Sequence, residues 1–323
     1  MPLNPLELLR ETYCVAPSPA VAPFVDHFRR VFGESLAAVV FYGSKLDDQL
    51  ATDTSFFDFY LICDDYRRFY RRRRDRWLAS FLPPNIYYLE LERPAGGKST
   101  CKYCVISLAD LKKHVAPDAK DFYHLGRFSK RLAVIWWRDT FERDEVLGAC
   151  YQAMETLTPH ALNKVGAVFT LPELIRRALA LSYEGEVRLE KTDEKVEALY
   201  RAAEPFYRAI WAHLLEQYRA FEPELFRPRL PEDDPETYYL RRPASLHAAQ
   251  LRETAALIRR SRRRAKARWP KSILLTDNWV DILLAKVERT YGVKLELTPR
   301  ERRWVLILGW RHFFRLRREG KIR

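Results

Sequence analysis

A glycine–serine turn, followed by a carboxylate in the next apolar run, is the first feature of this sequence that indicates chemistry. Gly43 and Ser44 close the β-branched and aromatic run at 35–44, and Asp58 lies in the similar run Phe56–Cys63. Such a turn presents backbone N–H groups and a hydroxyl, which bind the oxygens of a phosphate chain. A carboxylate beside it can hold Mg²⁺, which neutralises phosphate charge. The pattern predicts a phosphate site with Asp58 as metal ligand; the alternative is an ordinary turn and a strand-edge aspartate.

The acidic part of this pattern is incomplete. Nucleotidyltransferases of the polymerase-β type carry two acids separated by one residue on this strand. This chain has Phe56 at the first of the two positions and Asp58 at the second. A two-metal site therefore requires another carboxylate. The candidates are Glu90 and Glu92 in a later run and Asp53 in the preceding loop, and a surface role is the alternative for each.

The elements that must position these residues follow from the periodicity of the apolar side chains. Residues 22–33 have helical spacing, and five β-branched or aromatic runs predict strands at 35–44, 56–63, 86–92, 102–108 and 132–137. Because helices and strands are mixed, residues 1–145 are expected to form an α+β catalytic domain. Residues 146–244 are expected to form a mainly helical second domain that ends in a proline-rich, acidic loop at 221–243. Residues 245–323 have the pattern of a basic, amphipathic helical region.

The composition limits the class of protein and its partners. Of 323 residues, 47% are hydrophobic and 31% charged, so the chain can bury a sizeable core and wholesale disorder is excluded. The formal net charge of +13 predicts an anionic partner: nucleic acid, nucleotide phosphates or an acidic membrane surface. Five irregularly spaced cysteines do not suggest a disulfide framework, and no run reaches the roughly 18 to 20 apolar residues that span a bilayer. We therefore expect a cytoplasmic protein for which any membrane contact is peripheral, and charge alone does not choose among the three anionic partners.

Five pieces of sequence, in this order, resemble a known family. They are FYGS, FFDFYLICDD, KYCVISLADL, FYHLGRFSK and LSYEGEVR, and they span roughly residues 38–215. The chain is similar in them to the mitochondrial translocator assembly and maintenance family, the mitochondrial-type phosphatidate cytidylyltransferases (CDP-diacylglycerol synthases), as a bacterial-type member. The resemblance implies a polymerase-β-type nucleotidyltransferase domain with a mixed sheet. It also implies a Mg²⁺-dependent reaction of CTP with phosphatidic acid that yields CDP-diacylglycerol and pyrophosphate.

The resemblance also implies roles for individual residues. Gly43 and Ser44 would hold the CTP phosphates, and Asp58 would bind Mg²⁺. The remaining implied residues are Lys102 and Tyr103 near the nucleotide, Arg127 and Lys130 at the triphosphate or the lipid phosphate, Gly126 for close approach, and Tyr183, Gly185 and Arg188 in the second domain. Asp58, Lys102 and Arg127 are the predicted catalytic residues. Without the resemblance, Lys102 would be a strand-end surface residue, Tyr103 and Tyr183 core aromatics, and Arg188 a helix-face charge.

Four positions depart from the family pattern, which opens an alternative. Lys45, Cys104 and Arg131 replace a glycine, a glycine and a proline, and Glu186 stands where aspartate is usual. Lys45 can add a phosphate contact, and it puts an identical substrate in doubt. The alternative is a nucleotidyltransferase with another acceptor: RNA, a protein or a soluble phospho-alcohol. Cys101 and Cys104 have the spacing of half a zinc site, but no second pair accompanies them.

Two arginine-rich segments bear on the partner. Tyr66–Trp77 and Arg259–Lys271 have similar basic density, and aromatic residues recur near the carboxyl end at Trp304, Trp310, Phe313 and Phe314. Each basic residue near an anionic bilayer contributes about 1 kcal/mol of attraction, and aromatic rings settle at the headgroup level. Basic segments with aromatic residues also suit single-stranded nucleic acid. Because the acceptor of the resembled family is a lipid, the resemblance favours docking at the inner face of the cell membrane over nucleic acid, with solvated helix faces as the alternative. A non-enzymatic binding protein on a degenerate transferase fold is the third hypothesis.

Overall fold

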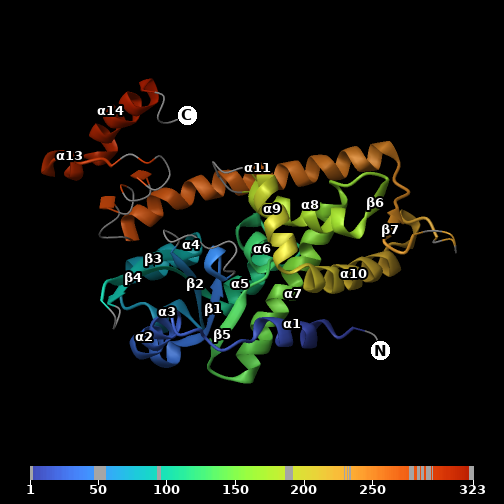
Figure 1. The fold of residues 1–323 in the computed structure, drawn as a ribbon, viewed down its shortest axis with the longest axis horizontal. Coiled ribbons are helices and arrows are strands. Elements are labelled where there is room, and N and C mark those ends of the chain that lie inside the picture. The colour runs from blue at the N-terminus through green and yellow to red at the C-terminus, as the bar shows by residue number, and fades with distance from the viewer. Residues whose placement is uncertain are drawn as a thin grey trace. The chain divides into compact units, whose positions relative to one another are not determined.

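The computed structural model describes residues 3–46, 56–92, 96–185 and 192–275, apart from 229, 231 and 233, together with parts of 280–319 (Figure 1). The chain divides into two compact units, Met1–Lys271 and Ser272–Arg323. Each unit is considered by itself.

A mixed five-stranded sheet organises the first unit. Its strands are β1 (Leu36–Tyr42), β2 (Phe57–Cys63), β3 (Asn85–Glu92), β4 (Lys98–Ser107) and β5 (Ala133–Trp137), in the order β3-β4-β2-β1-β5. β2 and β4 are parallel, and the other neighbours are antiparallel. The α+β class, the mixed sheet and all five predicted strands are confirmed. β4 begins four residues before the predicted strand because its pairing with β3 continues to Glu92 and Lys98.

Alternating side chains of the sheet build two cores. On one face Phe59 and Leu61 pack with α2 (Ala22–Phe32) and α3 (Tyr66–Phe69), and α4 (Arg73–Phe81) adds Ala79. On the other face Tyr60 and Ile62 belong to the larger core. That core also takes side chains from four helices: α1 (Pro5–Tyr13), α5 (Leu108–Val115), α6 (Phe122–Phe128) and α7 (Thr140–Leu162). Period-two alternation is therefore what separates the helices into two layers.

The helical segment continues the larger core. It contains α8 (Leu171–Glu184), α9 (Thr192–Ala202), α10 (Glu204–Phe221), the strand pair β6 (Val168–Thr170) and β7 (Thr237–Tyr239), and α11 (Ala244–Leu275). The predicted boundary near residue 145 falls inside α7, which packs against both the sheet and α8. Side chains on either side of residue 145 thus share one core, and residues 1–271 are one unit. α11 (Figure 1) contacts α7 through Thr254, which bonds to the His160 and Asn163 side chains. It contacts the beginning of α6 and the residue after α8 through Ser261, which bonds to the Phe122 N–H and the Gly185 carbonyl.

Short elements fill three connections. They are η1 (Gly33–Ser35), η2 (Ser44–Leu46) and η3 (Pro223–Leu225), each one 3₁₀ turn. The predicted loop at 221–243 contains the 3₁₀ turn η3 and the strand β7. β7 forms there because it pairs with β6.

The second unit contains α13 (Pro299–Arg303) and α14 (Val305–Arg318). Thr298 begins α13 with a capping box, since its side chain accepts from the Glu301 N–H and the Glu301 carboxylate accepts from the Thr298 N–H. Trp304, Trp310 and Phe314 are exposed. Much of 276–293, a part of the predicted amphipathic region, lies outside the described residues. Within the part of the chain that the structure describes, no helix is long and apolar enough to cross a bilayer.

Candidate functional site

The end of β1 and the beginning of β2 bring the glycine turn onto the strand carboxylate. Tyr42 pairs with Asp58 across the two strands, so Gly43 follows directly beside that carboxylate. Gly43 has a φ of +94°, and a Cβ there would lie 2.7 Å from Asp58 Oδ2. Glycine is required twice over, for the turn conformation and for the close approach. The residues that the sequence predicts for the phosphate turn and for the carboxylate are therefore neighbours.

Lys102 faces Asp58 from the adjacent strand. The parallel register of β2 and β4 pairs the two residues, and Lys102 Nζ lies 2.6 Å from Asp58 Oδ1. Burial favours the neutral amine, but the Asp58 carboxylate outweighs it and raises the pKa of Lys102 above its usual range. Lys102 is therefore an ammonium at neutral pH. Both side chains remain partly open to solvent, at 29% and 19% exposed, so a ligand can reach them.

The end of α6 supplies a basic wall. Arg127 donates from Nη1 to the Tyr123 carbonyl at 2.8 Å, and its guanidinium lies 3.7 Å from the centre of the Tyr123 ring. Lys130 Nζ lies 4.3 Å from the centre of the Tyr183 ring on α8. Cation–π contacts of this kind orient the charged groups without neutralising them. The approach of α6 to α8 depends on Gly126, where a Cβ would lie 2.8 Å from the backbone of α8.

These residues line one pocket of about 180 Å³. Among the described residues that line it, one is a carboxylate, Asp58, and five are basic: Lys102, Arg127, Lys130, Arg131 and Lys195. Gly43, Ser44 and Tyr183 also line it. The excess of positive charge suits a polyanion such as a phosphate chain.

Two of the basic residues were not selected from the sequence. Arg131 entered only as a departure from the family pattern, and the structure places it in the pocket, where its N–H donates to the Tyr207 hydroxyl at 3.0 Å. Lys195 comes from α9 and belongs to none of the quoted motifs. A basic residue on a helix gives no local signal, so only the packing of α9 reveals Lys195.

Other predicted residues lie elsewhere. Tyr103 is on the opposite face of the sheet, with its ring 5.2 Å from that of Phe28 and 5.3 Å from that of Tyr87. Since neighbours along a strand point to opposite faces, Lys102 and Tyr103 cannot enter the same pocket from β4. Gly185 is a packing residue, because a Cβ there would lie 2.7 Å from atoms of two other helices. Arg188, Asp53 and Glu186 lie outside the described residues.

Two departures from the family pattern have structural explanations. Lys45 Nζ lies 4.3 Å from the centre of the Phe57 ring, and the lysine does not line the pocket. Cys104 is buried, with its sulfur 3.6 Å from the Tyr42 hydroxyl. Cys101 belongs to the core on the other side of the sheet, so the two cysteines cannot form half of a zinc site.

Of the carboxylates considered as Mg²⁺ ligands, only Asp58 lines the pocket among the described residues. Glu90 pairs with Lys98 at 3.1 Å on the exposed edge strand, and Glu92 lies opposite Lys98 in the register. Neither lines the pocket, and no group of three metal-binding side chains occurs among the described residues. Mg²⁺ is commonly held by one or two carboxylates, with substrate phosphates and water completing its shell. Asp58 fits a Mg²⁺ ion bound in that way together with a nucleotide.

A buried ion pair between α6 and α11 supports the basic wall. Asp121 caps α6, accepting from the Tyr123 N–H at 3.0 Å, and is fully buried. Arg268 donates to the Asp121 carboxylate at 2.9 Å, Arg264 also pairs with it, and the Arg268 guanidinium lies 4.2 Å from the centre of the Tyr123 ring. Burial opposes ionisation of Asp121, but the two arginines outweigh it and hold its pKa below the usual range. Tyr123 therefore contacts one guanidinium from the pocket and one from α11.

The same helix also holds the connection after α4. Arg268 Nε donates to the Pro83 carbonyl at 3.1 Å, and Lys271 Nζ donates to the carbonyls of Leu82 and Pro84. Burial, followed by the repulsion of Arg268, lowers the pKa of Lys271 to about 7. The carboxyl-terminal part of α11 thus joins α4 to α6.

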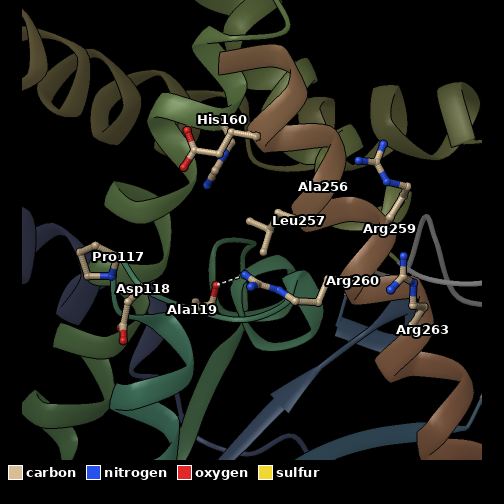
Figure 2. A pocket seen from close by; sticks show the side chains of 10 residues that line it. Pro117, Asp118, Ala119, His160, Ala256, Leu257, Arg259, Arg260 and Arg263 are labelled. Carbon is tan, nitrogen blue, oxygen red and sulfur yellow. Dashed lines mark hydrogen bonds between the residues drawn. The ribbon is translucent and has the colours of Figure 1, made fainter. Parts of the chain in front are cut away.

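A second, wider hollow of about 520 Å³ lies between α11, α7 and the connection before α6. In Figure 2, Arg260 points toward Ala119, whose carbonyl it contacts, while Arg259 and Arg263 lie on the side of α11 away from His160. Asp118 and Glu253 add negative charge to the same lining. The charged groups do not converge on one position, and this hollow has no clear ligand chemistry.

The sequence was also compared with known proteins. No model of a known protein family matches the chain, and no curated protein matches it. Support for a function therefore comes from the pocket residues and from the sequence motifs that contain several of them.

Proposed function

We propose that this protein is a Mg²⁺-dependent phosphatidate cytidylyltransferase, which forms CDP-diacylglycerol and pyrophosphate from CTP and phosphatidic acid. One observation supports it most: the Gly43–Ser44 turn meets the Asp58 carboxylate inside a pocket with five basic side chains. The order of five sequence motifs supports the choice of CTP and phosphatidic acid. Under this proposal, the mixed sheet is a polymerase-β-type nucleotidyltransferase domain.

The size of the pocket suits the phosphates of the nucleotide. Sites that enclose a whole drug-sized ligand measure about 300–1,000 Å³, whereas this pocket measures about 180 Å³. The backbone of the turn and the Ser44 hydroxyl would donate to the triphosphate, and Lys102, Arg127 and Lys130 would balance its charge. The described residues therefore account for the phosphate end of CTP.

The reaction requires positioning more than proton transfer. A phosphate oxygen of phosphatidic acid would attack the α-phosphorus of CTP in line, the new P–O bond would form, and the bond to the β-phosphate would break. A phosphate monoester has its second pKa near 6, so the attacking oxygen is already mostly deprotonated at neutral pH. No general base is needed. Arg127, Lys130 and the Lys102 ammonium would stabilise the charge that develops on the departing pyrophosphate.

Asp58 has two tasks in this scheme. Its carboxylate holds the Lys102 ammonium in the pocket, at 2.6 Å. It would also bind Mg²⁺ together with the triphosphate. When bound, Mg²⁺ supplies neutralisation of phosphate charge.

The test uses labelled CTP, Mg²⁺ and vesicles with or without phosphatidic acid. Label should enter the lipid phase with wild-type protein only when phosphatidic acid is present, and pyrophosphate should appear in equal amount. Asp58→Asn should lower the rate by 10²-fold or more, since the site loses its one described carboxylate. Asp26→Asn, on the exposed face of α2, is the matched control and should keep the wild-type rate.

Two outcomes contradict the proposal. If Asp58→Asn retains the wild-type rate, then the pocket is not the active site. If pyrophosphate appears without label in the lipid, then the acceptor is not phosphatidic acid, and a parallel survey of ATP, GTP and CTP with RNA and soluble phospho-alcohols identifies the transferase. Melting curves of both variants exclude unfolding as the cause.

A further inference from the structure

Helix α4 exposes two large aromatic side chains to solvent. Trp77 is 63% and Phe81 69% exposed, and their rings are stacked, with centres 5.3 Å apart and planes 4° from parallel. The two residues are one helical turn apart, so they lie on the same side of α4. Most large apolar side chains of this unit are buried. An aromatic pair in water gives up the free energy that its burial would supply, which marks it as an interaction site.

The residues beside this pair are strongly basic. Arg71, Arg72, Arg73 and Arg74 are all exposed, directly before and at the beginning of α4. We call these four arginines together with Trp77 and Phe81 the α4 surface. Arg74 pairs with the adjacent Asp75 at 3.2 Å, and the group of four consecutive arginines still keeps an excess of positive charge, which an anionic partner would neutralise.

The α4 surface is held rigidly by the opposite side of the helix. Leu78 and Ala79 are buried, and the Asp75 carbonyl accepts from the Asn85 side chain at 2.9 Å. Arg76 donates to the Tyr70 carbonyl at 2.8 Å, which ties the preceding segment to the helix. The exposed aromatic pair is therefore presented by a fixed helix.

We propose that the α4 surface docks on an anionic lipid membrane, with Trp77 and Phe81 in the headgroup region and the four arginines against lipid phosphates. Charge complementarity and the aromatic pair together favour this partner, since aromatic rings settle at the membrane interface and basic residues are drawn to its negative potential. Docking needs no catalysis, so this inference goes beyond the proposed function.

Hydrogen bonds from α11 connect the segment after α4 to α6, which lines the pocket. The connection that follows α4 accepts hydrogen bonds from Arg268 and Lys271. Arg268 in turn pairs with Asp121 at the beginning of α6 and lies over Tyr123, which Arg127 also contacts. A membrane bound at the α4 surface would thus hold α6 at a fixed position relative to the lipid.

Vesicle binding by the full chain, measured without nucleotide, tests the proposal. Wild-type protein should sediment with vesicles of phosphatidylcholine and phosphatidylglycerol far more than with phosphatidylcholine alone. The double variant Trp77→Ser/Phe81→Ser should bind anionic vesicles roughly tenfold more weakly, which is about 1.4 kcal/mol. Arg72→Gln and Arg73→Gln should each weaken binding roughly fivefold, with a smaller effect at high salt. The matched control is Phe141→Ser/Phe221→Ser, two rings elsewhere that are 68% and 80% exposed, which should bind as wild type does.

Wild-type binding by Trp77→Ser/Phe81→Ser would overturn the proposal, and so would equal loss in the control pair. A single-stranded oligonucleotide in the same buffer provides the other arm. If the α4 variants lose oligonucleotide binding while vesicle binding is unchanged, the surface is a nucleic-acid site and the proposal is wrong. Because no CTP is present, failure here leaves the proposed reaction open to its own test.

Discussion

Two arginine-rich segments of similar density are used in opposite ways. In Tyr66–Trp77 the arginines at 71–74 are exposed beside exposed aromatic rings. In Arg259–Lys271 five basic side chains donate within the unit, to backbone carbonyls or to a buried carboxylate; they are Arg260, Arg262, Arg264, Arg268 and Lys271. The sequence predicted the same membrane-docking role for both. Charge density alone therefore does not distinguish a docking surface from a clasp, our name for these five side chains of α11, which bind other segments of the same unit.

The two segments differ in the hydrogen-bond acceptors that lie next to them. α11 lies against helix ends and connections whose carbonyls have no helical partner, including those of Glu184, Lys120 and Pro83. Guanidinium groups satisfy such carbonyls well because they offer several donors in a plane. The arginines at 71–74 are exposed, and Arg74 pairs with the adjacent Asp75 at 3.2 Å. The structure therefore assigns much of the second basic segment to internal contacts, although Arg260 and Arg262, which make such contacts, are exposed, as are Arg259, Arg263 and Lys266.

The largest effect on stability is expected at Arg268. Arg268→Ala removes a guanidinium that is 4% exposed and leaves Asp121, which is fully buried, with less compensation. Removing one partner of a buried ion pair costs about 3–5 kcal/mol. We expect a loss of about 3 kcal/mol in the free energy of unfolding, measured by urea denaturation, because Arg264 remains. A loss below about 1 kcal/mol would mean that this contact of the second segment does little for the stability of the fold.

A medium effect is expected from the titration of Lys271. Its folded pKa of about 7 lies below that of the unfolded chain, near 10.4. Above pH 7 the unfolded chain binds the additional proton, so folding stability gains from this group as pH rises, and the gain is absent below pH 7. From pH 7 to 8 the rise should be about 1 kcal/mol. The measurement compares how the free energy of unfolding depends on pH in wild type and in Lys271→Met. Equal pH dependence of the two proteins would contradict the burial of a Lys271 amine with a lowered pKa.

The smallest effect on stability is expected in the first segment. Arg72→Ala/Arg73→Ala should change the free energy of unfolding by no more than about 0.5 kcal/mol for each residue, because surface substitutions away from buried contacts do little. Relief of like-charge repulsion should make the change stabilising at low salt. The same urea series measures it. A loss comparable with that of Arg268→Ala would mean that both segments serve the fold.

Much of the sheet and of the pocket follows from local pattern. The β-branched runs predicted all five strands, and the Gly43–Ser44 turn, Asp58 and Lys102 come together because β1, β2 and β4 are neighbours. Tyr103 follows Lys102 directly on β4, so its side chain points to the opposite face of the sheet and cannot line the pocket. Lys195 was not predictable, because its position depends on how α9 packs and not on its neighbours in sequence.

The clasp of α11 could not be predicted for a related reason. Its partners are mostly backbone carbonyls, which every residue carries and which therefore leave no pattern of residue types. The predicted boundary near residue 145 has the same origin. A change from mixed to helical periodicity looks like a change of domain, whereas α7 uses its length to pack against both parts.

The ion pair between Asp121 and Arg268 joins positions 147 residues apart in the sequence. Ribosomes add roughly 5–20 residues per second, so about 7 to 30 s pass between the synthesis of the two partners. The five strands are complete well before that interval ends, whereas α6 waits for α11 to secure its first turn. The wall that carries Arg127 is thus among the last parts of this unit to be finished in a growing chain, and an interrupted translation would leave a nascent sheet beside an unsupported pocket.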